Sequence, residues 1–573
     1  MKRSNKLMAL IGLLITASLV LAACGPAAAP TAQVIEVTKI VAGTPVVQVV
    51  TATPPPKPTG PKAFIFGAQG EPVCLDPAII TDGISGRVTN QVYEGLVKFD
   101  GSTTNVIPSL AESWTTSDDG LVWKFKLHEG VKFHDGTDFN AEAVVKNWDY
   151  WHNTSNPLHK AQLDAGQVFE YYGAQFGGFD DASVIASVEA TGTHEVTFTL
   201  RQPQGPFLNN LGMFIFVFWS PAALEAAGTD SCKTPVGTGP FKFVEWKPGE
   251  QVTLEKFADY WDTANAAKVD QVIIRNIPNN SQRLLALSAG EIHGMEGLES
   301  DDVAALQANP DFQVLLRPAN NTGYVAFNYN YAEFQDVRVR QAFAHAIDKK
   351  SIVDAFYGGT GLVAKEFQPP SLWGYNPDIE DYAFDTAKAK ALLAEAGFPD
   401  GLSEVTAADG AKVALDFWYM PVSRPYYPNP KDIATAIAAQ LAEAGITVNL
   451  QTVDWATYLD KRSNGDLMLY MLGWTGDNGD PDNFVCYFFC DPPRSNEGFV
   501  NDAEVADLLA QAARLTDQAE RAELYQQAEQ LIHDRTLRIF VANNEPPLAF
   551  AAGVTGYVPN PTGTEFFNTV DVP

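Results

Sequence analysis

Basic residues are scarce in this sequence. Lys and Arg number 39 against 69 Asp and Glu, which gives a formal net charge of −30 at pH 7. A field of this sign repels phosphate backbones and anionic lipid surfaces. We therefore expect no nucleic-acid partner, and we attribute the acidity itself to solubility alone.

Motifs for catalysis are missing as well. None of the eight histidines belongs to an HExxH motif or to an i, i+4 pair, so the ligands of a zinc hydrolase are not in place. The sequence also has no GxSxG, GxxxxGK or GxGxxG segment, the usual marks of acyl transfer, nucleotide binding and dinucleotide binding. We therefore expect no catalytic residue, no cofactor and no enzyme activity.

The first 24 residues have the layout of an export signal. Basic residues precede an uncharged, mostly apolar run over residues 7–23, as in a secretory signal peptide. The run ends in LAACG, which resembles a bacterial lipobox, in which the cysteine is lipidated and becomes the first mature residue. An uncleaved membrane helix is disfavoured, because the run is at the short limit for spanning and no stop-transfer charges follow. We expect Cys24 to anchor an exported protein to the outer face of the cytoplasmic membrane, within a periplasm or at the cell surface.

The next segment, up to Lys62, has almost no charge and is dominated by Ala, Pro, Thr and Val. Four prolines lie between residues 54 and 58. Proline-rich stretches stay extended and bury little surface. The segment is therefore predicted to be a spacer that lifts a folded body off the membrane.

The remaining chain has the length and patterning of a mixed α/β protein. Single domains usually stop growing near roughly 250 to 300 residues, so 573 residues predict at least two lobes. Apolar residues alternate at Trp123–Leu127 and Val196–Leu200, which predicts half-buried strands. Helical spacing predicts one helix from Asp385 to Gly397 and another from Ile433 to Gly445, the second followed by a strand at Ile446–Leu450.

Cysteine is infrequent, at five residues. If Cys24 is lipidated, an even set is left in an oxidising compartment: Cys74, Cys232, Cys486 and Cys490. Three pairings are possible. We favour the local pair Cys486–Cys490, which leaves Cys74 and Cys232 for each other. A zinc cluster is disfavoured because CxxC spacing and nearby histidines are lacking, so no metal is expected.

Long segments of the body resemble the peptide and nickel class of bacterial extracellular solute-binding proteins, family 5. The matching segments are LDPA from Leu75, NQVYEGLVKFD at 90–100, IPSLAESW at 107–114, 118–144, 235–250 and 336–353. The resemblance implies a hinged α/β fold of the periplasmic-binding-protein type II, with two lobes that close over a ligand and an additional domain. It also implies a monomer that delivers its cargo to the transmembrane subunits of an ABC permease.

This resemblance implies a division of the chain into discontinuous domains. The expected units are a signal peptide (1–23), a lipid-anchored linker (24–62), the core domain of lobe 1 (63–92, 230–320 and 545–573), an additional domain of lobe 1 (93–229) and a lobe 2 domain (321–544).

Two further segments are similar to the dipeptide-binding members of the family: MPVSRPYYPNP at 420–430 and GWTGDNGDPDNF at 473–484. By matching motifs, Arg424 takes the ligand carboxylate and Asp477 takes its α-ammonium. Tyr426 and Trp474 are expected to form apolar walls, and the same motif contributes Gly473 and Thr475 to the site. Two positions depart from the family pattern: Tyr427 replaces asparagine, and His293 in GEIHGM replaces aspartate.

The assigned chemistry is reasonable for a dipeptide, because both charged ends of a zwitterion must be neutralised when a closing cleft removes their water. A plain turn or a calcium loop is the alternative for GDNGDPDN, but the spacing of its oxygen ligands does not fit a calcium loop. Two other functions stay open: the same transport role with an oligopeptide, glycan, haem or nickel chelate, and a surface hydrolase or adhesin on this scaffold.

Overall fold

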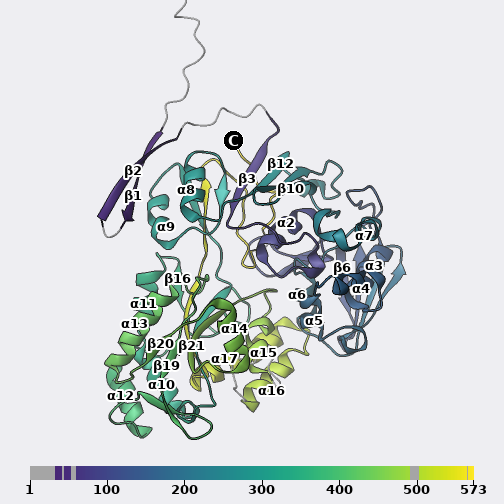
Figure 1. Cartoon of the computed structure of the whole chain (residues 1–573). Helices are drawn as coiled ribbons and strands as arrows, with labels where there is room; N and C mark the ends of the chain where they lie inside the picture. The colour runs from purple at the N-terminus through teal and green to yellow at the C-terminus, as the bar shows by residue number, and fades with distance from the viewer. Residues whose placement is uncertain (1–32, 42–43, 53–59, 491–501, 564) are drawn as a thin grey trace, which may run out of the picture.

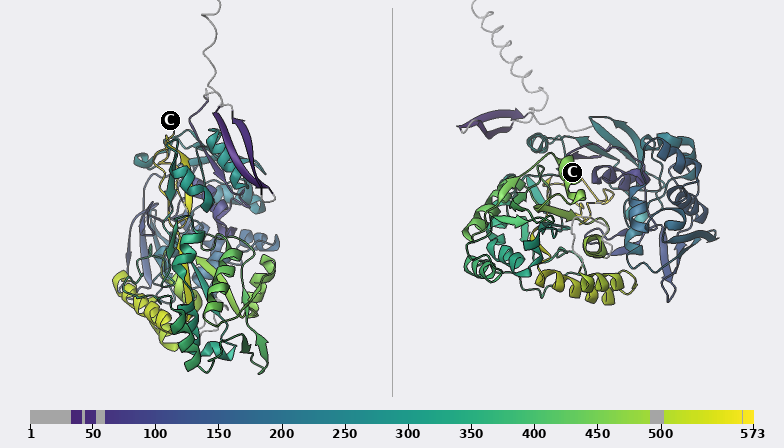
Figure 2. Two further views of the ribbon diagram at one scale, coloured as in Figure 1. Left: turned by 90° about the vertical axis from the view of Figure 1, so that its left-hand side faces the viewer. Right: turned by 60° about the horizontal axis from the view of Figure 1, so that its bottom comes forward.

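The computed structural model describes residues 33–41, 44–52, 60–490, 502–563 and 565–573. The predicted signal peptide and Cys24 lie outside these residues. Two lobes, each built on its own sheet, stand side by side in Figure 1 and in the right-hand view of Figure 2. No helix among the described residues is both long enough and apolar enough to cross a membrane.

The first lobe contains a seven-stranded sheet whose strands come from distant parts of the chain. In spatial order the strands are β10 (Phe241–Lys247), β11 (Gln251–Lys256), β12 (Gln271–Asn276), β3 (Ala63–Ala68), β13 (Gly294–Met295), β23 (Pro547–Ala551) and β14 (Phe312–Leu316). The helices α2 (Gly83–Val92), α8 (Asn280–Ser288) and α9 (Ser300–Gln307) accompany this sheet. Phe64 and Phe66 on β3 are fully buried and anchor the core.

His293 has a structural place beside β3. Its backbone N–H donates to the carbonyl of Ile65 at 2.7 Å, and its ring Nδ1 accepts from the N–H of Ile65 at 3.0 Å. An aspartate carboxylate offers an acceptor of the same kind, which explains how the two residue types can replace each other at this position.

A smaller antiparallel sheet extends the first lobe. Its strands in spatial order are β6 (Ala111–Thr116), β7 (Val122–Leu127), β9 (Glu195–Leu200) and β8 (Ile185–Gly192), and a separate pair is formed by β4 (Val97–Phe99) and β5 (Val106–Pro108). The accompanying helices are α3 (Ala141–His152), α4 (Pro157–Asp164), α5 (Glu170–Phe176), α6 (Phe207–Leu211) and α7 (Pro221–Ala227). The two strands predicted from alternation are confirmed as β7 and β9, with their apolar residues buried.

The second lobe surrounds a six-stranded sheet. In spatial order the strands are β16 (Gly361–Val363), β22 (Arg538–Asn544), β15 (Asn321–Phe327), β21 (Leu469–Thr475), β19 (Asp416–Trp418) and β20 (Asn449–Gln451). A short hairpin, β17 (Glu404–Thr406) and β18 (Lys412–Ala414), lies apart from it. The helices are α10 (Val337–Ala346), α11 (Lys349–Phe356), α12 (Thr386–Glu395), α13 (Pro430–Glu443), α14 (Trp455–Asn464), α15 (Asp482–Phe489), α16 (Ala503–Ala512) and α17 (Gln518–Asp534).

The two helices predicted in this lobe are confirmed. Asp385 caps α12 by accepting a hydrogen bond from the N–H of Lys388, and Gly397 follows the helix with a φ of 99°. After α13, Gly445 has a φ of 84°, and the chain enters β20. Such positive φ values are easy for glycine, so both glycines let the chain turn sharply after a helix.

The segment before the body contains structure that the sequence analysis missed. Strand β1 (Gln33–Val41) pairs with β2 (Thr44–Ala52) as an antiparallel hairpin that joins neither large sheet. The predicted spacer over 24–62 therefore contains two strands that its composition had not led us to expect. The Val, Ile and Thr residues of this segment favour strands, and the prolines at 54–58 follow only after it.

Two disulfides are present among the described residues, Cys74–Cys232 and Cys486–Cys490. The first ties the start of lobe 1 to the segment after α7, and the second closes the C-terminal turn of α15. The local pairing that we favoured from spacing therefore agrees with the structure.

The chain crosses between the two sheets at two places. One crossing lies between β14 and β15, and the other between β22 and β23. Two adjacent crossing segments between rigid lobes form the arrangement in which hinge closure is common.

Candidate functional site

Asp477 lies in the turn between β21 and α15, and Asn483 holds it there. The N–H of Asp477 donates to Asn483 Oδ1 at 3.0 Å, and Asn483 Nδ2 donates to Asp477 Oδ2 at 3.2 Å. The same Oδ1 accepts from the indole N–H of Trp474 at 3.0 Å. The side chain of Asn483 therefore holds both the carboxylate of Asp477 and the ring of Trp474, which is one of the two predicted apolar walls. The sequence analysis did not single it out, although it belongs to the quoted motif.

The carboxylate of Asp477 also meets the other lobe. The hydroxyl of Tyr171, on α5, donates to Asp477 Oδ1 at 3.0 Å. Burial raises the pKa of Asp477 to about 6, although the hydrogen bonds from Asn483 and Tyr171 act in the opposite direction. In the part of the chain that the structure describes, no Lys, Arg or His forms an ion pair with Asp477. A half-buried carboxylate of this kind is suited to a cation supplied by a ligand.

Gly473 makes room for Tyr426. A Cβ atom on Gly473 would lie 2.3 Å from the Cδ2 atom of Tyr426, so only glycine lets the tyrosine ring lie against β21. Tyr426 is consequently only 6% exposed. Trp474 is half-buried and stacks on Tyr487 of α15 with ring centroids 4.6 Å apart. Thr475, at the end of β21, is exposed and pairs with Asn321.

Arg424 is exposed and lies on a turn that is closed by two backbone hydrogen bonds between residues 424 and 427. Its guanidinium group lies 5.0 Å from the ring centroid of Trp455, at the start of α14. No described hydrogen bond or ion pair joins Arg424 to Asp477. The neighbouring Tyr427 is fully buried in the core of lobe 2. Because this tyrosine stands where the family pattern has asparagine, the departure changes the packing beneath the turn.

The loop after Asp477 makes further contacts with lobe 1. Asn209 Nδ2 donates to the carbonyl of Asn478 at 3.0 Å, and Asn478 Nδ2 donates to Asn210 Oδ1 at 2.7 Å. Elsewhere along the lobe boundary, the N–H of Gly205 donates to the carbonyl of Ala513 at 2.7 Å. The two lobes are therefore in direct contact. No pattern in the sequence pointed to the lobe 1 residues of these contacts.

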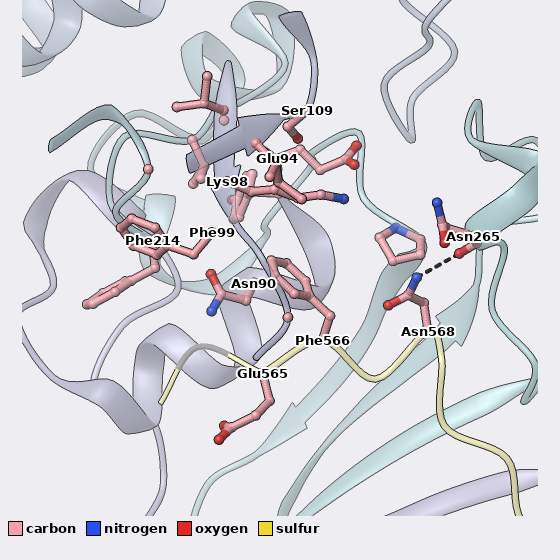
Figure 3. A pocket seen from close by; sticks show the side chains of 18 of the residues that line it. Asn90, Glu94, Lys98, Phe99, Ser109, Phe214, Asn265, Glu565, Phe566 and Asn568 are labelled. Carbon is pink, nitrogen blue, oxygen red and sulfur yellow. Dashed lines mark hydrogen bonds between the residues drawn. The ribbon is translucent and has the colours of Figure 1, made fainter. Parts of the chain in front are cut away.

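A separate cavity of about 240 Å³ lies within lobe 1 and is shown in Figure 3. None of the six residues predicted to bind ligand lines it. Among the described residues, Asn90 Nδ2 and Ser109 Oγ at this cavity have no hydrogen-bond partner. A cavity of this size accommodates ordered water, which would satisfy both groups.

Metal ligands do not gather in the described parts of the chain. No group of three or more His, Cys, Asp or Glu side chains there is arranged to hold a metal ion.

Comparison with known proteins assigns the chain to a family. Residues 105–496 match the model of the bacterial extracellular solute-binding proteins, family 5 Middle. The chain belongs to this family. It is therefore a solute-binding protein of the class that serves ABC importers outside the cytoplasm, with the expected two-lobed α/β fold.

Individual family members match over most of their length. The dipeptide-binding protein of Escherichia coli (strain K12) is 34% identical over 526 residues, covering 89% of this chain and 95% of that protein. The heme-binding protein A of Haemophilus influenzae is 35% identical over 536 residues, covering 91% and 94%.

Solved structures of family members agree with the fold. HbpA2 from Haemophilus parasuis gives a TM-score of 0.80 at 32% identity, covering 89% of this chain and 100% of that chain. The dipeptide-binding protein from Pseudoalteromonas sp. SM9913, in complex with Met-Leu, gives 0.73 at 29% identity, with the same coverage.

Proposed function

We propose that this family member captures peptides with free termini, above all dipeptides, and delivers them to the transmembrane subunits of an ABC permease. The observation that carries the proposal is Asp477, a half-buried carboxylate at the contact between the lobes with no cationic partner among the described residues. A peptide α-ammonium supplies the missing charge. The protein binds its cargo and releases it unchanged.

The two ends of the ligand are held by opposite charges in this proposal. Arg424 offers a planar fork of donors that suits a carboxylate, and Asp477 accepts hydrogen bonds from an ammonium group without offering competing donors. Tyr426 and Trp474 contribute apolar surface, and Gly473 and Thr475 shape the strand beneath the ligand. Fixed ends with apolar walls allow several different side chains in between.

The names of relatives support a peptide cargo, and one of them supports a second candidate. The Escherichia coli relative is called a dipeptide-binding protein, and the Pseudoalteromonas structure contains Met-Leu. The Haemophilus influenzae relative, at 35% identity, is called a heme-binding protein. The second candidate is therefore the same transport role with haem or another non-peptide cargo.

The setting of the protein also belongs to the proposal. We propose export by residues 1–23, a lipid anchor on Cys24, a linker to residue 62 and a monomeric body. Within the body, residues 321–544 form lobe 2 and residues 93–229 form the additional domain. The remaining ranges, 63–92, 230–320 and 545–573, form the core domain of lobe 1.

Calorimetric titration of the ligand-free body tests the peptide proposal. A free dipeptide is expected to bind more tightly than the same dipeptide blocked at either end. Equal binding of free and blocked dipeptides would contradict the two-ended arrangement. Binding of haem in place of dipeptides would favour the second candidate.

Lowering the pH below about 6 is expected to weaken the binding of free dipeptides, because burial raises the pKa of Asp477 to about 6. Below that pKa the carboxyl must lose a proton before it can bind an ammonium group. The dissociation constant should therefore rise by roughly tenfold for each pH unit. Titrations between pH 4.5 and 8 measure this slope, and Asp477→Asn should abolish it. An unchanged slope in that variant would assign the pH dependence to another group.

Gly205→Ala is expected to weaken ligand binding by at least roughly tenfold without altering the ligand residues. The added Cβ atom would lie 2.5 Å from the carbonyl oxygen of Leu515 and 2.7 Å from Arg521 Nε, so the lobes could not approach fully. With ligand present, small-angle scattering should report a larger radius of gyration for Gly205→Ala than for the wild type. Gly192→Ala in the same part of lobe 1 meets no atom closer than 3.5 Å and serves as the control. Equal affinities for both variants would show that this contact does not contribute to closure.

A further inference from the structure

The two segments that cross between the lobes are fastened by side-chain amides. Asn321, at the start of β15, donates from Nδ2 to the carbonyl of Asn544 at 2.8 Å and accepts at Oδ1 from its N–H at 3.1 Å. Asn543 Nδ2 donates to the carbonyl of Asn321 at 2.8 Å and to Thr322 Oγ1 at 2.7 Å. The three asparagines are 6% exposed or less. We call Asn321, Asn543 and Asn544 the hinge clasp.

The clasp continues the strand pairing where the regular ladder stops. Strand β15 pairs with β22 from Ala326 to Gly323, with an irregularity next to Gly323. Beyond Gly323, the side-chain amide of Asn321 hydrogen-bonds to the backbone carbonyl and N–H of Asn544, as the backbone of a neighbouring strand would. Buried hydrogen bonds with both partners satisfied resist separation, because an unpaired amide inside the protein is costly. The two crossing segments should therefore move together.

The side chain of Asn544 connects this clasp to the turn that carries Arg424. Its Nδ2 donates to the carbonyl of Pro425 at 2.9 Å, and its Oδ1 accepts from the hydroxyl of Thr360 at 2.7 Å. The next carbonyl of the turn, that of Tyr426, accepts from the hydroxyl of Tyr357 at 2.7 Å. The carbonyl groups of Pro425 and Tyr426 are thus each held by a hydrogen bond from a side chain of lobe 2. Both backbone groups and both side-chain polar atoms of Asn544 are engaged.

We infer that Asn544 is a positioning residue that couples the ligand-carboxylate end of the site to the hinge. This inference rests on the proposed peptide function and on the place of Arg424 in it. A ligand carboxylate bound by Arg424 holds the 424–427 turn in place. The carbonyl of Pro425 in that turn orients the side-chain amide of Asn544. The backbone of Asn544 is in turn bonded to Asn321, and this pair holds the two crossing segments together. The reverse also holds, so an open hinge presents Arg424 in a less favourable position.

Asn543 provides a matched control. It belongs to the same clasp, is equally buried and bonds to Asn321, but its described hydrogen bonds do not reach the 424–427 turn. Asn543→Ala removes two hydrogen bonds of the clasp, whereas Asn544→Ala keeps the clasp, which uses the backbone of Asn544, and removes the hydrogen bonds to Pro425 and Thr360. A purely structural role for these two side chains predicts no effect that depends on the carboxylate of the ligand. The coupling role predicts a difference that depends on the carboxylate of the ligand.

The experiment titrates the wild type, Asn544→Ala and Asn543→Ala with L-alanyl-L-phenylalanine and with its C-terminal amide. The ratio of the two affinities measures what the carboxylate contributes. We expect Asn544→Ala to lower the affinity for the free dipeptide by about tenfold, as for the one hydrogen bond that it loses to the 424–427 turn, and to leave the affinity for the amide nearly unaffected. Asn543→Ala should leave the ratio at its wild-type value. An unchanged ratio in Asn544→Ala would overturn the inference.

A second variant guards against misfolding. Asn544→Leu roughly keeps the side-chain size, adds no charge and removes the donor to Pro425, so it should show the same loss of the affinity ratio with a native circular dichroism spectrum. A wild-type ratio in a folded Asn544→Leu protein would also overturn the coupling. If the wild type binds the free dipeptide and its C-terminal amide with equal affinity, the proposed function itself is refuted. This outcome is seen in the wild-type titrations alone, so it cannot be confused with a failure of the coupling.

Discussion

Asp477→Ala is expected to weaken the binding of a free dipeptide on the order of 30-fold to several thousand-fold, which corresponds to about 2 to 5 kcal/mol. The large effect arises because the ligand ammonium would be enclosed between the lobes without a counter-charge. Tyr171 and Asn483 already bond to the two oxygens of this carboxylate, and neither carries a charge that could replace it. Calorimetric titration at pH 7.5 measures the loss.

The matched comparison uses Asp477→Asn and an N-acetylated dipeptide. The asparagine side chain has the same shape and retains one acceptor toward Tyr171, so it isolates the charge from the packing. Both variants should bind the N-acetylated dipeptide about as well as the wild type does, because that ligand has no ammonium group. If the free dipeptide binds to Asp477→Asn with wild-type affinity, the ammonium is held elsewhere.

Glu366→Gln is expected to stabilise the folded body at neutral and alkaline pH by on the order of 3 kcal/mol. Glu366 and Glu529 are both fully buried in lobe 2. Glu529 accepts hydrogen bonds from the backbone N–H groups of Phe367 and Gln368 at 3.2 and 3.0 Å. Burial, followed by repulsion from Glu529, raises the pKa of Glu366 to about 10. Burial also raises the pKa of Glu529, to about 7.

The direction of the pH dependence follows from these pKa values. In the unfolded chain a glutamate loses its proton near pH 4.5, whereas folded Glu366 retains it to about pH 10. The folded state therefore binds more protons between these values, and stability falls as the pH rises through this window. Glutamine carries no titrating proton and can still accept the 2.7 Å hydrogen bond from the N–H of Asn376.

Chemical denaturation of both proteins at pH 5 and pH 8 measures the difference, which should be small at pH 5 and large at pH 8. Glu333→Gln is the matched control with the opposite sign. Although burial opposes it, hydrogen bonds from Lys412 and Thr406 lower the pKa of Glu333 to about 2. That variant should be less stable than the wild type at both pH values. A Glu366→Gln protein no more stable than the wild type at pH 8 would show that the buried pair carries no net penalty.

Local features of the fold were predictable because they are encoded by neighbouring residues. The alternation in Val122–Leu127 and the capped helix Thr386–Glu395 each depend on side chains within a few positions, and both elements are present. The pairing of β1 with β2 was not predicted, although the Val, Ile and Thr residues of both strands favour strands locally.

The sequence by itself determined the family and the mixed α/β class, and it also supplied the proposal that Arg424 and Asp477 bind the ligand, because both residues lie in continuous motifs. Only the tertiary structure decided what surrounds them. Tyr171 reaches Asp477 across 306 positions of the chain, and Asn544 reaches Pro425 across 119. Such contacts are made by strands and helices that meet only after folding, so no spacing along the chain records them. Periodicity reports which face of an element is buried, whereas the packing of the lobes decides which polar groups then face each other.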